Sequence, residues 1–172
     1  MISGISVLRP VIGEVDQGWK VAMATTSSER GLSLRSPGRF MATATRLIDL
    51  YHRYRNRCDP VIRDQVLQAW MDAQAYRWFT FQTVTRMSEG EPIGPDSSMN
   101  KVFWSEMDVR TYETALAIIG DALELDEGSR SAVDSGHWMK GFQFALAGPI
   151  YAGTNEIQRN IISERVLGLP RK

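Results

Sequence analysis

The fold is decided most clearly by one stretch, YAGTNEIQRNIISERVLGLPR, which covers residues 151–171. Gly153 gives the backbone the freedom that a turn needs. Thr154 is a good N-cap, and Glu156 adds a negative charge in the first helical turn, where the helix dipole favours it. The stretch therefore predicts a glycine hinge followed by a capped helix.

The same helix carries an apolar stripe and two stop signals. Gly168 and Pro170 are residues that end helices. Apolar residues before them recur at helical spacing. The stripe consists of Ile157, Ile161, Ile162, Val166 and Leu169.

The chain before this stretch reads as a series of helices joined by short loops. A short helix is expected after Asp16 as its N-cap. A long helix is expected from Ser28, interrupted or kinked at Pro37. Its second half has a stripe with spacings of 4, 3, 4 and 3: Phe40, Ala44, Leu47, Tyr51 and Tyr54. Three further segments combine helix starts and stops with apolar periodicity: 60–87, 96–123 and 138–147.

These segments predict an all-α fold, an antiparallel up-and-down four-helix bundle with extra short helices. Residues 1–15 are β-prone and read as a short extended N-terminal segment. Tyr51, Trp70 and Trp78 are read as core or subunit-interface residues, and several aromatic residues are expected to be buried against another subunit.

Composition limits the possible functions. The chain has 172 residues, 43% of them hydrophobic, and a formal net charge of zero, which argues against nucleic-acid binding. No apolar run approaches the ~20 residues that span a bilayer, and no signal peptide is visible. The single cysteine, Cys58, excludes an internal disulfide and fits a cytoplasmic protein. His52 and His137 are given no role, and no metal site is expected.

Residues 151–171 closely resemble the C-terminal signature of acyl-CoA dehydrogenases. The GEVDQGW segment at 13–19 is similar to the passage between the middle β-domain and the helical C-terminal domain of that family. The resemblance implies that 1–15 is a remnant of the β-domain or linker and that 16–172 is the C-terminal bundle domain. It also implies that the isolated chain is colourless and inactive, because the domain that cradles the flavin ring is absent.

The family's reaction is α,β-dehydrogenation of an acyl-CoA thioester, in which a glutamate removes a proton and FAD accepts the β-hydrogen. Many members place the glutamate directly after the signature tyrosine, where this chain has Ala152. Other members carry it in a Glu-Arg pair, which Glu29-Arg30 resembles. Glu29 is therefore the expected catalytic base. Two alternatives stay open: Glu29 is only a first-turn acid of its helix, or the chain is a subunit without a base, partnered with an active one.

The resemblance assigns further residues around the signature. Thr154, Asn155 and Glu156 match positions that contact FAD, and a helix N-terminus offers N–H groups to an anionic ligand. Ala152 and Gly153 match positions that line the acyl-CoA pocket.

A second flavin contact is expected from an arginine that, in the family, reaches the cofactor of a neighbouring subunit. Arg55 is the candidate, with Arg57 as an alternative register. The family's Phe-Gly after this arginine is absent. Residues 118–121 keep only one glycine of the family's Gln-x-x-Gly-Gly segment. The family also implies an electron-transfer flavoprotein as acceptor and a homo- or hetero-oligomer built as a dimer of dimers.

Overall fold

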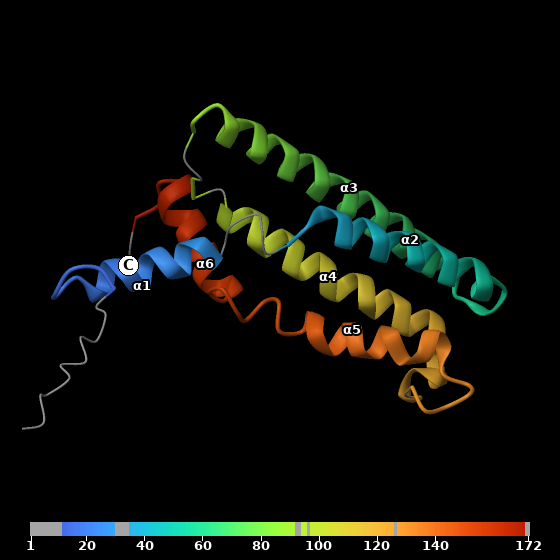
Figure 1. Cartoon of the computed structure of the whole chain (residues 1–172). Helices are drawn as coiled ribbons and strands as arrows, with labels where there is room; N and C mark the ends of the chain where they lie inside the picture. Colours follow the sequence, from blue (N-terminus) through green and yellow to red (C-terminus); the bar gives the residue numbers. More distant parts are fainter. Residues whose placement is uncertain (1–11, 30–34, 92–93, 96, 126, 171–172) are drawn as a thin grey trace, which may run out of the picture.

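The structure, a computed structural model, describes most of the chain: residues 12–29, 35–91, 94–95, 97–125 and 127–170. Helices dominate these residues, and no strand occurs among them. Figure 1 shows four helices side by side, each running opposite to the one before it: α2 (Pro37–Tyr54), α3 (Pro60–Ser88), α4 (Ser97–Ile119) and α5 (His137–Ala145). The predicted all-α antiparallel bundle is confirmed.

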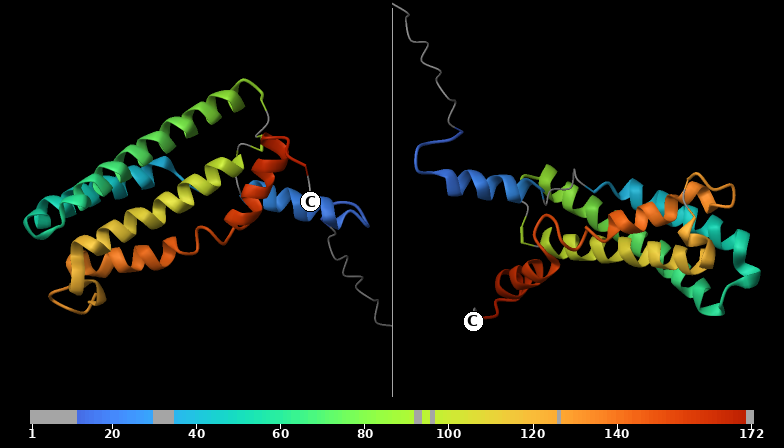
Figure 2. Two further views of the ribbon diagram at one scale, coloured as in Figure 1. Left: turned by 180° about the vertical axis from the view of Figure 1, so that it is seen from behind. Right: turned by 90° about the horizontal axis from the view of Figure 1, so that it is seen from below.

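Shorter elements flank the bundle. They are α1 (Gly18–Glu29), α6 (Asn155–Ile161), the 3-10 helices η2 (Arg55–Arg57), η3 (Gly120–Glu124) and η4 (Val133–Gly136), and the π-helical turn η5 (Ile162–Val166). The two further views in Figure 2 agree with Figure 1 in placing α1 and α6 at the same end of the bundle. None of the helices among the described residues is long and apolar enough to cross a bilayer.

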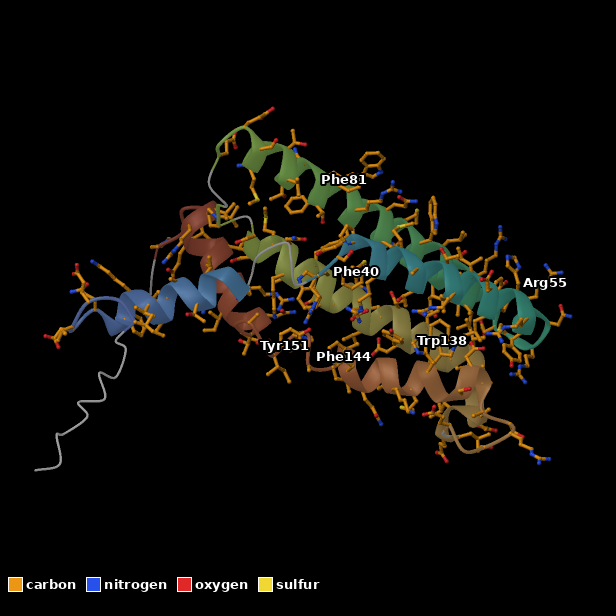
Figure 3. All side chains as sticks on the ribbon, in the orientation of Figure 1. Phe40, Arg55, Phe81, Trp138, Phe144 and Tyr151 are labelled. Atoms are coloured by element: carbon orange, nitrogen blue, oxygen red, sulfur yellow. The ribbon has the colours of Figure 1, made fainter. Side chains whose placement is uncertain are left out.

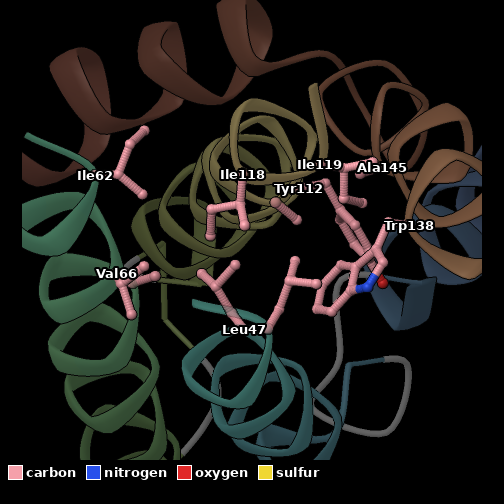
Figure 4. Close-up of a cluster of buried hydrophobic side chains, with 11 residues drawn as sticks. Leu47, Ile62, Val66, Tyr112, Ile118, Ile119, Trp138 and Ala145 are labelled. Carbon is pink, nitrogen blue, oxygen red and sulfur yellow. The ribbon is translucent and has the colours of Figure 1, made fainter. Parts of the chain in front are cut away.

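α4 is the central helix, since it packs against α2, α3, α5 and α6. The core around it contains Leu47 and Leu50, both fully buried, and the rings of Tyr112 and Trp138, which meet edge to face at 6.0 Å (Figure 4). Gly141 permits this close approach, because a Cβ there would lie 2.1 Å from the Tyr112 ring. Apolar packing from four helices therefore holds this end of the bundle together.

The helix 60–87 was predicted correctly, and α3 ends one residue later. The Asp59 side chain accepts a hydrogen bond from the Val61 N–H at 2.9 Å, and Pro60 follows as the first helical residue. A capping acid followed by proline is a local signal that needs no tertiary contact.

Of the two possibilities for the helix expected from Ser28, an interruption or a kink at Pro37, the structure shows an interruption, since α1 ends at Glu29. Pro37 begins α2, and the Ser36 side chain caps it by accepting from the Gly38 N–H at 3.2 Å. A residue that precedes proline is pushed out of the helical conformation, which makes Ser36 a natural boundary. The Ser-Pro pair is thus the same start signal as Asp59-Pro60.

The first helix also differs from the prediction. α1 begins at Gly18, whereas Asp16, the predicted cap, has φ +68° and lies in a turn before it. Ser28 and Glu29 are the last residues of α1, and so Glu29 is not a first-turn acid. The proposed extended segment lies mostly in 1–11, outside the described residues; residues 12–15 form bends and the start of a turn.

The apolar stripe of the terminal helix is only partly buried in this chain, since Ile161 and Ile162 are half-buried and the other three members are exposed. Ile157 is 50% exposed, and Val166 and Leu169 are also exposed. The buried residues of α6 are instead Asn155 and Gln158. Gly168 ends the helical segment in the left-handed region, as predicted.

Candidate functional site

The turn between α5 and α6 has an unusual backbone. Ala152 and Gly153 both have positive φ, +55° and +82°. The fully buried Gln158 side chain lies beneath them and donates through Nε2 to the carbonyl oxygens of Ala152 at 3.1 Å and Gly153 at 3.2 Å. A Cβ at position 153 would come within 2.5 Å of that nitrogen, so glycine is required. One glutamine therefore fixes the shape of the turn.

The start of α6 is held on α4 by a buried polar network around Asn155. Its Oδ1 accepts from the Lys101 ammonium at 2.6 Å and from the Ser105 hydroxyl at 3.1 Å. Its Nδ2 donates to the Glu106 carboxylate at 3.1 Å, and the same carboxylate pairs with Arg159. The Asn155 amide therefore makes three hydrogen bonds within the chain, all to residues of α4.

Lys101 is a buried cation, only 2% exposed. Burial lowers the pKa of its ammonium to about 8, against the opposing influence of the nearby Glu156 and Glu106 carboxylates. Because a buried charge is costly without partners, the short contact with Asn155 is central to keeping Lys101 in place.

Thr154 and Glu156 form the outer part of the same turn. The Thr154 hydroxyl oxygen accepts from the Ile157 N–H at 3.4 Å, which confirms Thr154 as the N-cap. Glu156 is exposed, and hydrogen bonds from its own backbone N–H and from Thr154 lower the pKa of its carboxyl. These two side chains present oxygen atoms at the surface beside Gly153.

An aromatic platform adjoins the turn. The Tyr151 ring lies 6.1 Å from the Trp104 ring, and the Arg35 guanidinium stacks over both at 4.8 and 4.7 Å. The Tyr76 hydroxyl donates to the Arg35 carbonyl oxygen at 2.9 Å. The segment just before α2 is thereby brought against the residue that precedes Ala152.

A buried carboxylate lies one helical turn beyond Trp104 on α4. Asp108 is 3% exposed and accepts from Arg39 at 2.7 Å. Burial raises the pKa of Asp108, and the positive charges of Arg39 and Arg35 oppose that rise. The pair ties the first turn of α2 to α4.

The structure brings five of the predicted site residues together in one turn: Ala152, Gly153, Thr154, Asn155 and Glu156. Arg55 is exposed in η2 at the opposite end of the bundle from Tyr151 (Figure 3). The backbone of Glu29 ends α1, and its side chain lies outside the described part of the chain.

Lys101, Ser105 and Asp108 were missed in the sequence, although a signal was present. They recur at i, i+4 and i+7 among the buried residues of α4, where apolar side chains are expected. Polar residues on the core-facing stripe of a helix mark a buried network rather than a solvated face. No group of three or more His, Cys, Asp or Glu residues in the described structure could hold a metal ion.

Comparison with known proteins gives one family. The family described as "Acyl-CoA dehydrogenase, C-terminal domain" matches residues 16–167. Two curated relatives are the acyl-CoA dehydrogenases IpdE1 of Mycolicibacterium smegmatis, 37% identical, and of Mycobacterium tuberculosis, 35% identical. Each alignment covers 94% of this chain but only 39% and 41% of the relative. The chain thus spans about two fifths of the length of these curated relatives.

Solved structures show the same fold. The protein titled "Tcur3481-Tcur3483 steroid ACAD" superposes with a TM-score of 0.80 at 22% identity, over 93% of this chain and 42% of that one. The ChsE4–ChsE5 complex from Mycobacterium tuberculosis gives a TM-score of 0.75 at 25% identity, over 93% of this chain and 43% of that one.

Proposed function

We propose that this chain, which belongs to the acyl-CoA dehydrogenase family, forms one wall of an acyl-CoA and FAD site in a longer enzyme. The chain matches the C-terminal domain of that family. That enzyme would remove the α- and β-hydrogens of an acyl-CoA thioester. The observation that carries the proposal is the turn at Ala152 and Gly153, whose carbonyl oxygens accept from Gln158 and which the Asn155 network anchors to α4.

The turn suits a substrate that must approach the backbone closely. Ala152 and Gly153 have no bulky side chain, and both are half-buried. Gln158 and Asn155 fix their positions, so the turn does not need to reorganise when a ligand binds. We assign Ala152 and Gly153 to the wall that faces the thioester.

The start of α6 suits the neutral polar parts of FAD. The ionised Glu156 would repel a pyrophosphate, but it can accept hydrogen bonds from ribose hydroxyls or an adenine amino group, as can Thr154. The pyrophosphate of FAD is negatively charged, so it needs cationic side chains as partners. Arg55 lies at the far end of this bundle, so it would reach such a group only from another copy. FAD, when bound, supplies the two-electron acceptor that the dehydrogenation requires.

Proton removal is assigned to Glu29. It lies six residues before Arg35, whose guanidinium stacks on Tyr151, so the backbone of Glu29 can be at most about 20 Å from that of Arg35. Burial beside a bound thioester would raise the pKa of a carboxylate towards the range of a general base. Electrons would then pass to an electron-transfer flavoprotein.

The test is Glu29→Gln in the full-length protein that contains this chain. We expect turnover to fall by roughly 10²–10⁴-fold while acyl-CoA affinity changes little, because the amide cannot take a proton. Glu124→Gln, an exposed acid in η3, is the matched control. Restoration of turnover by Ala152→Glu in the Glu29→Gln protein would place the turn beside the substrate. Full turnover by Glu29→Gln alone would exclude Glu29 as the base.

A second candidate function is that of a non-catalytic subunit in a heteromeric enzyme. Ala152 favours it, since a methyl group cannot accept a proton, and one solved relative is titled as a complex of two chains. In that case Glu29→Gln would leave the turnover of the assembled enzyme unchanged.

A further inference from the structure

Arg35 is a cation held next to the proposed substrate wall. Its guanidinium lies 4.7 Å from the centre of the Trp104 ring and 4.8 Å from that of the Tyr151 ring. Its carbonyl oxygen accepts from the Tyr76 hydroxyl at 2.9 Å, so its backbone is anchored as well. Tyr151 directly precedes Ala152, the first residue of the turn that the proposed function places beside the thioester. A fixed positive charge therefore adjoins that turn.

Stacking leaves the edge of a guanidinium open to hydrogen bonds. The N–H donors of arginine lie in the plane of the group, and two of them can bind one carboxylate side by side. Rings that pack on the flat faces do not use these donors. Arg35 is half-buried. A side chain in this arrangement can bind a ligand in addition to the contacts that it makes within the chain.

The charges around Arg35 favour an anionic ligand. A second guanidinium, that of Arg39, contacts the buried Asp108 carboxylate at 2.7 Å. Burial and the positive charge of Arg39 lower the pKa of Arg35, against the opposing charge of Asp108. Among the described residues, two arginine side chains thus lie around one carboxylate. Because a desolvated cation is costly without a counter-charge, a negative group bound here would be stabilised.

The other side chains around the two arginines are aromatic. Arg39 lies over the Phe40 ring at 5.0 Å and over the Phe144 ring at 5.8 Å. Trp104 connects Phe40 to Tyr151 through ring contacts of 6.2 and 6.1 Å. Aromatic surfaces suit a hydrocarbon chain, and a few placed polar groups fix its orientation. The wall therefore suits an acyl chain that carries a negative group better than one that is hydrocarbon alone.

We propose that Arg35 is a specificity-determining residue that binds a carboxylate on the acyl group of the substrate. The preferred substrate is then the CoA thioester of a dicarboxylic acid, with one carboxyl group in the thioester and the other at Arg35. This inference deepens the proposed function and rests on it, since Ala152 and Gly153 must face the thioester. Arg35 selects and orients the substrate and takes no part in proton removal.

Two other anions in such an enzyme share this chemistry: the phosphates of CoA and the pyrophosphate of FAD. The acyl carboxylate is favoured, because Arg35 adjoins the thioester end of the wall, whereas the phosphates of CoA lie at the far end of its pantetheine arm. The three contacts also predict different results. A contact with CoA phosphates serves every CoA ester equally, a contact with FAD affects flavin content, and a contact with an acyl carboxylate affects only esters that carry one.

The test is Arg35→Met in the full-length protein that contains this chain. Methionine keeps an unbranched side chain between the two rings but has no charge and no N–H donor. Turnover and KM are measured with ω-carboxyacyl-CoA esters of increasing chain length, each paired with the monocarboxylic ester of the same length. We expect the unmodified protein to prefer a carboxylate ester. Arg35→Met should raise the KM of that ester roughly 10- to 100-fold, since a charge-assisted hydrogen bond is lost, and should leave its monocarboxylic partner nearly unchanged.

Two further variants separate charge from packing. Arg35→Lys keeps the charge and loses the planar fork, so part of the preference should remain. Arg77→Met is the matched control, because Arg77 also stacks on aromatic rings, those of Trp78 and Phe81, which are 63% and 44% exposed on α3. It should change neither KM. Flavin absorbance and circular dichroism check the cofactor content and the folding of each protein.

Three outcomes would overturn this inference alone. They are oxidation of both ester types without a preference for the carboxylate, an equal rise of both KM values in Arg35→Met, and a loss of flavin in Arg35→Met with the preference retained. The second result would assign Arg35 to the CoA phosphates or to the shape of the wall, and the third would assign it to FAD. Oxidation of no acyl-CoA ester by the unmodified protein would remove the proposed function and this inference with it.

Discussion

α3 and α6 belong to the same bundle but are held by different kinds of interaction. α3 buries apolar residues such as Ile62 and Val66 against α2 and α4. α6 buries Asn155 and Gln158 and leaves Ile157 half-exposed. The long helix is thus held by non-directional packing, whereas the short one is held by directional hydrogen bonds that also set the turn at Ala152.

The difference follows from length and position. α3 spans about eight turns, so one face can bury enough apolar surface to dock it. α6 has only seven residues, and its first turn must keep one orientation beside the turn at Gly153. Hydrogen bonds fix orientation better than apolar contact, because their strength depends on angle as well as distance. Three experiments test whether the two helices are held in these different ways.

The largest expected effect on stability is at the apolar core that holds α3. Leu47→Ala deletes a fully buried side chain and should lower the free energy of unfolding by about 3 kcal/mol, since a cavity remains where the chain cannot collapse. Urea denaturation measures this, and protection from hydrogen exchange should fall across α2, α3 and α4 together. The half-exposed Leu146→Ala should cost well under about 1 kcal/mol. A similar loss in both variants would mean that Leu47 is not in a tight core.

A smaller and more local effect on stability is expected at the polar network that holds α6. Asn155→Ala removes the acceptor for Lys101 and Ser105 and leaves a buried cation poorly compensated, at a cost of about 2 kcal/mol. Hydrogen exchange should accelerate in α6 before it does in α3. Asn160→Ala, on the exposed side of the same helix, is the control. If α3 lost protection at the same rate as α6, the two regions would be one cooperative unit.

The smallest effect concerns pH. Burial lowers the pKa of Lys101 to about 8 in the folded chain, whereas an unfolded lysine titrates near 10.5. Between these values the unfolded state binds more protons, so this group makes the protein more stable as the pH rises. We expect a gain of roughly 1 kcal/mol from pH 8 to 9.5 that Lys101→Met abolishes.

The upper limit of that pH window is set by Tyr76. Its pKa is raised to about 12 by burial, so the folded state keeps its proton after the unfolded state has lost it, and stability falls with pH above about 10. Unfolding curves at pH 8.0 and 9.5 avoid this opposite trend. An equal gain in Lys101→Met would show that another group is responsible.

Capping residues, a proline and a glycine correctly predicted several helix ends. Asp59-Pro60 begins α3, Thr154 caps α6, and Gly168 ends the terminal segment as expected. Ser36-Pro37 contained the same start signal, but the sequence left open whether Pro37 interrupts or only kinks the helix. The end of α1 at Glu29 was missed, because a helix was expected to begin at Ser28.

For the candidate site, the sequence predicted one continuous segment and none of the distant residues that pack around it. Residues 152–156 come together because they are neighbours in the chain, and this much the signature implied. Arg35 and Lys101 lie far from that segment in sequence, and only tertiary contacts with Tyr151 and Asn155 bring them near it.

Local sequence patterns suffice for the all-α class, most helix starts, the capped terminal helix and the family resemblance, because caps, prolines and periodicity act over a few residues. The tertiary structure decided which face of each helix is buried. It placed polar residues under the turn and left an apolar face of α3 open, since burial depends on what packs opposite a helix, and no local pattern records that.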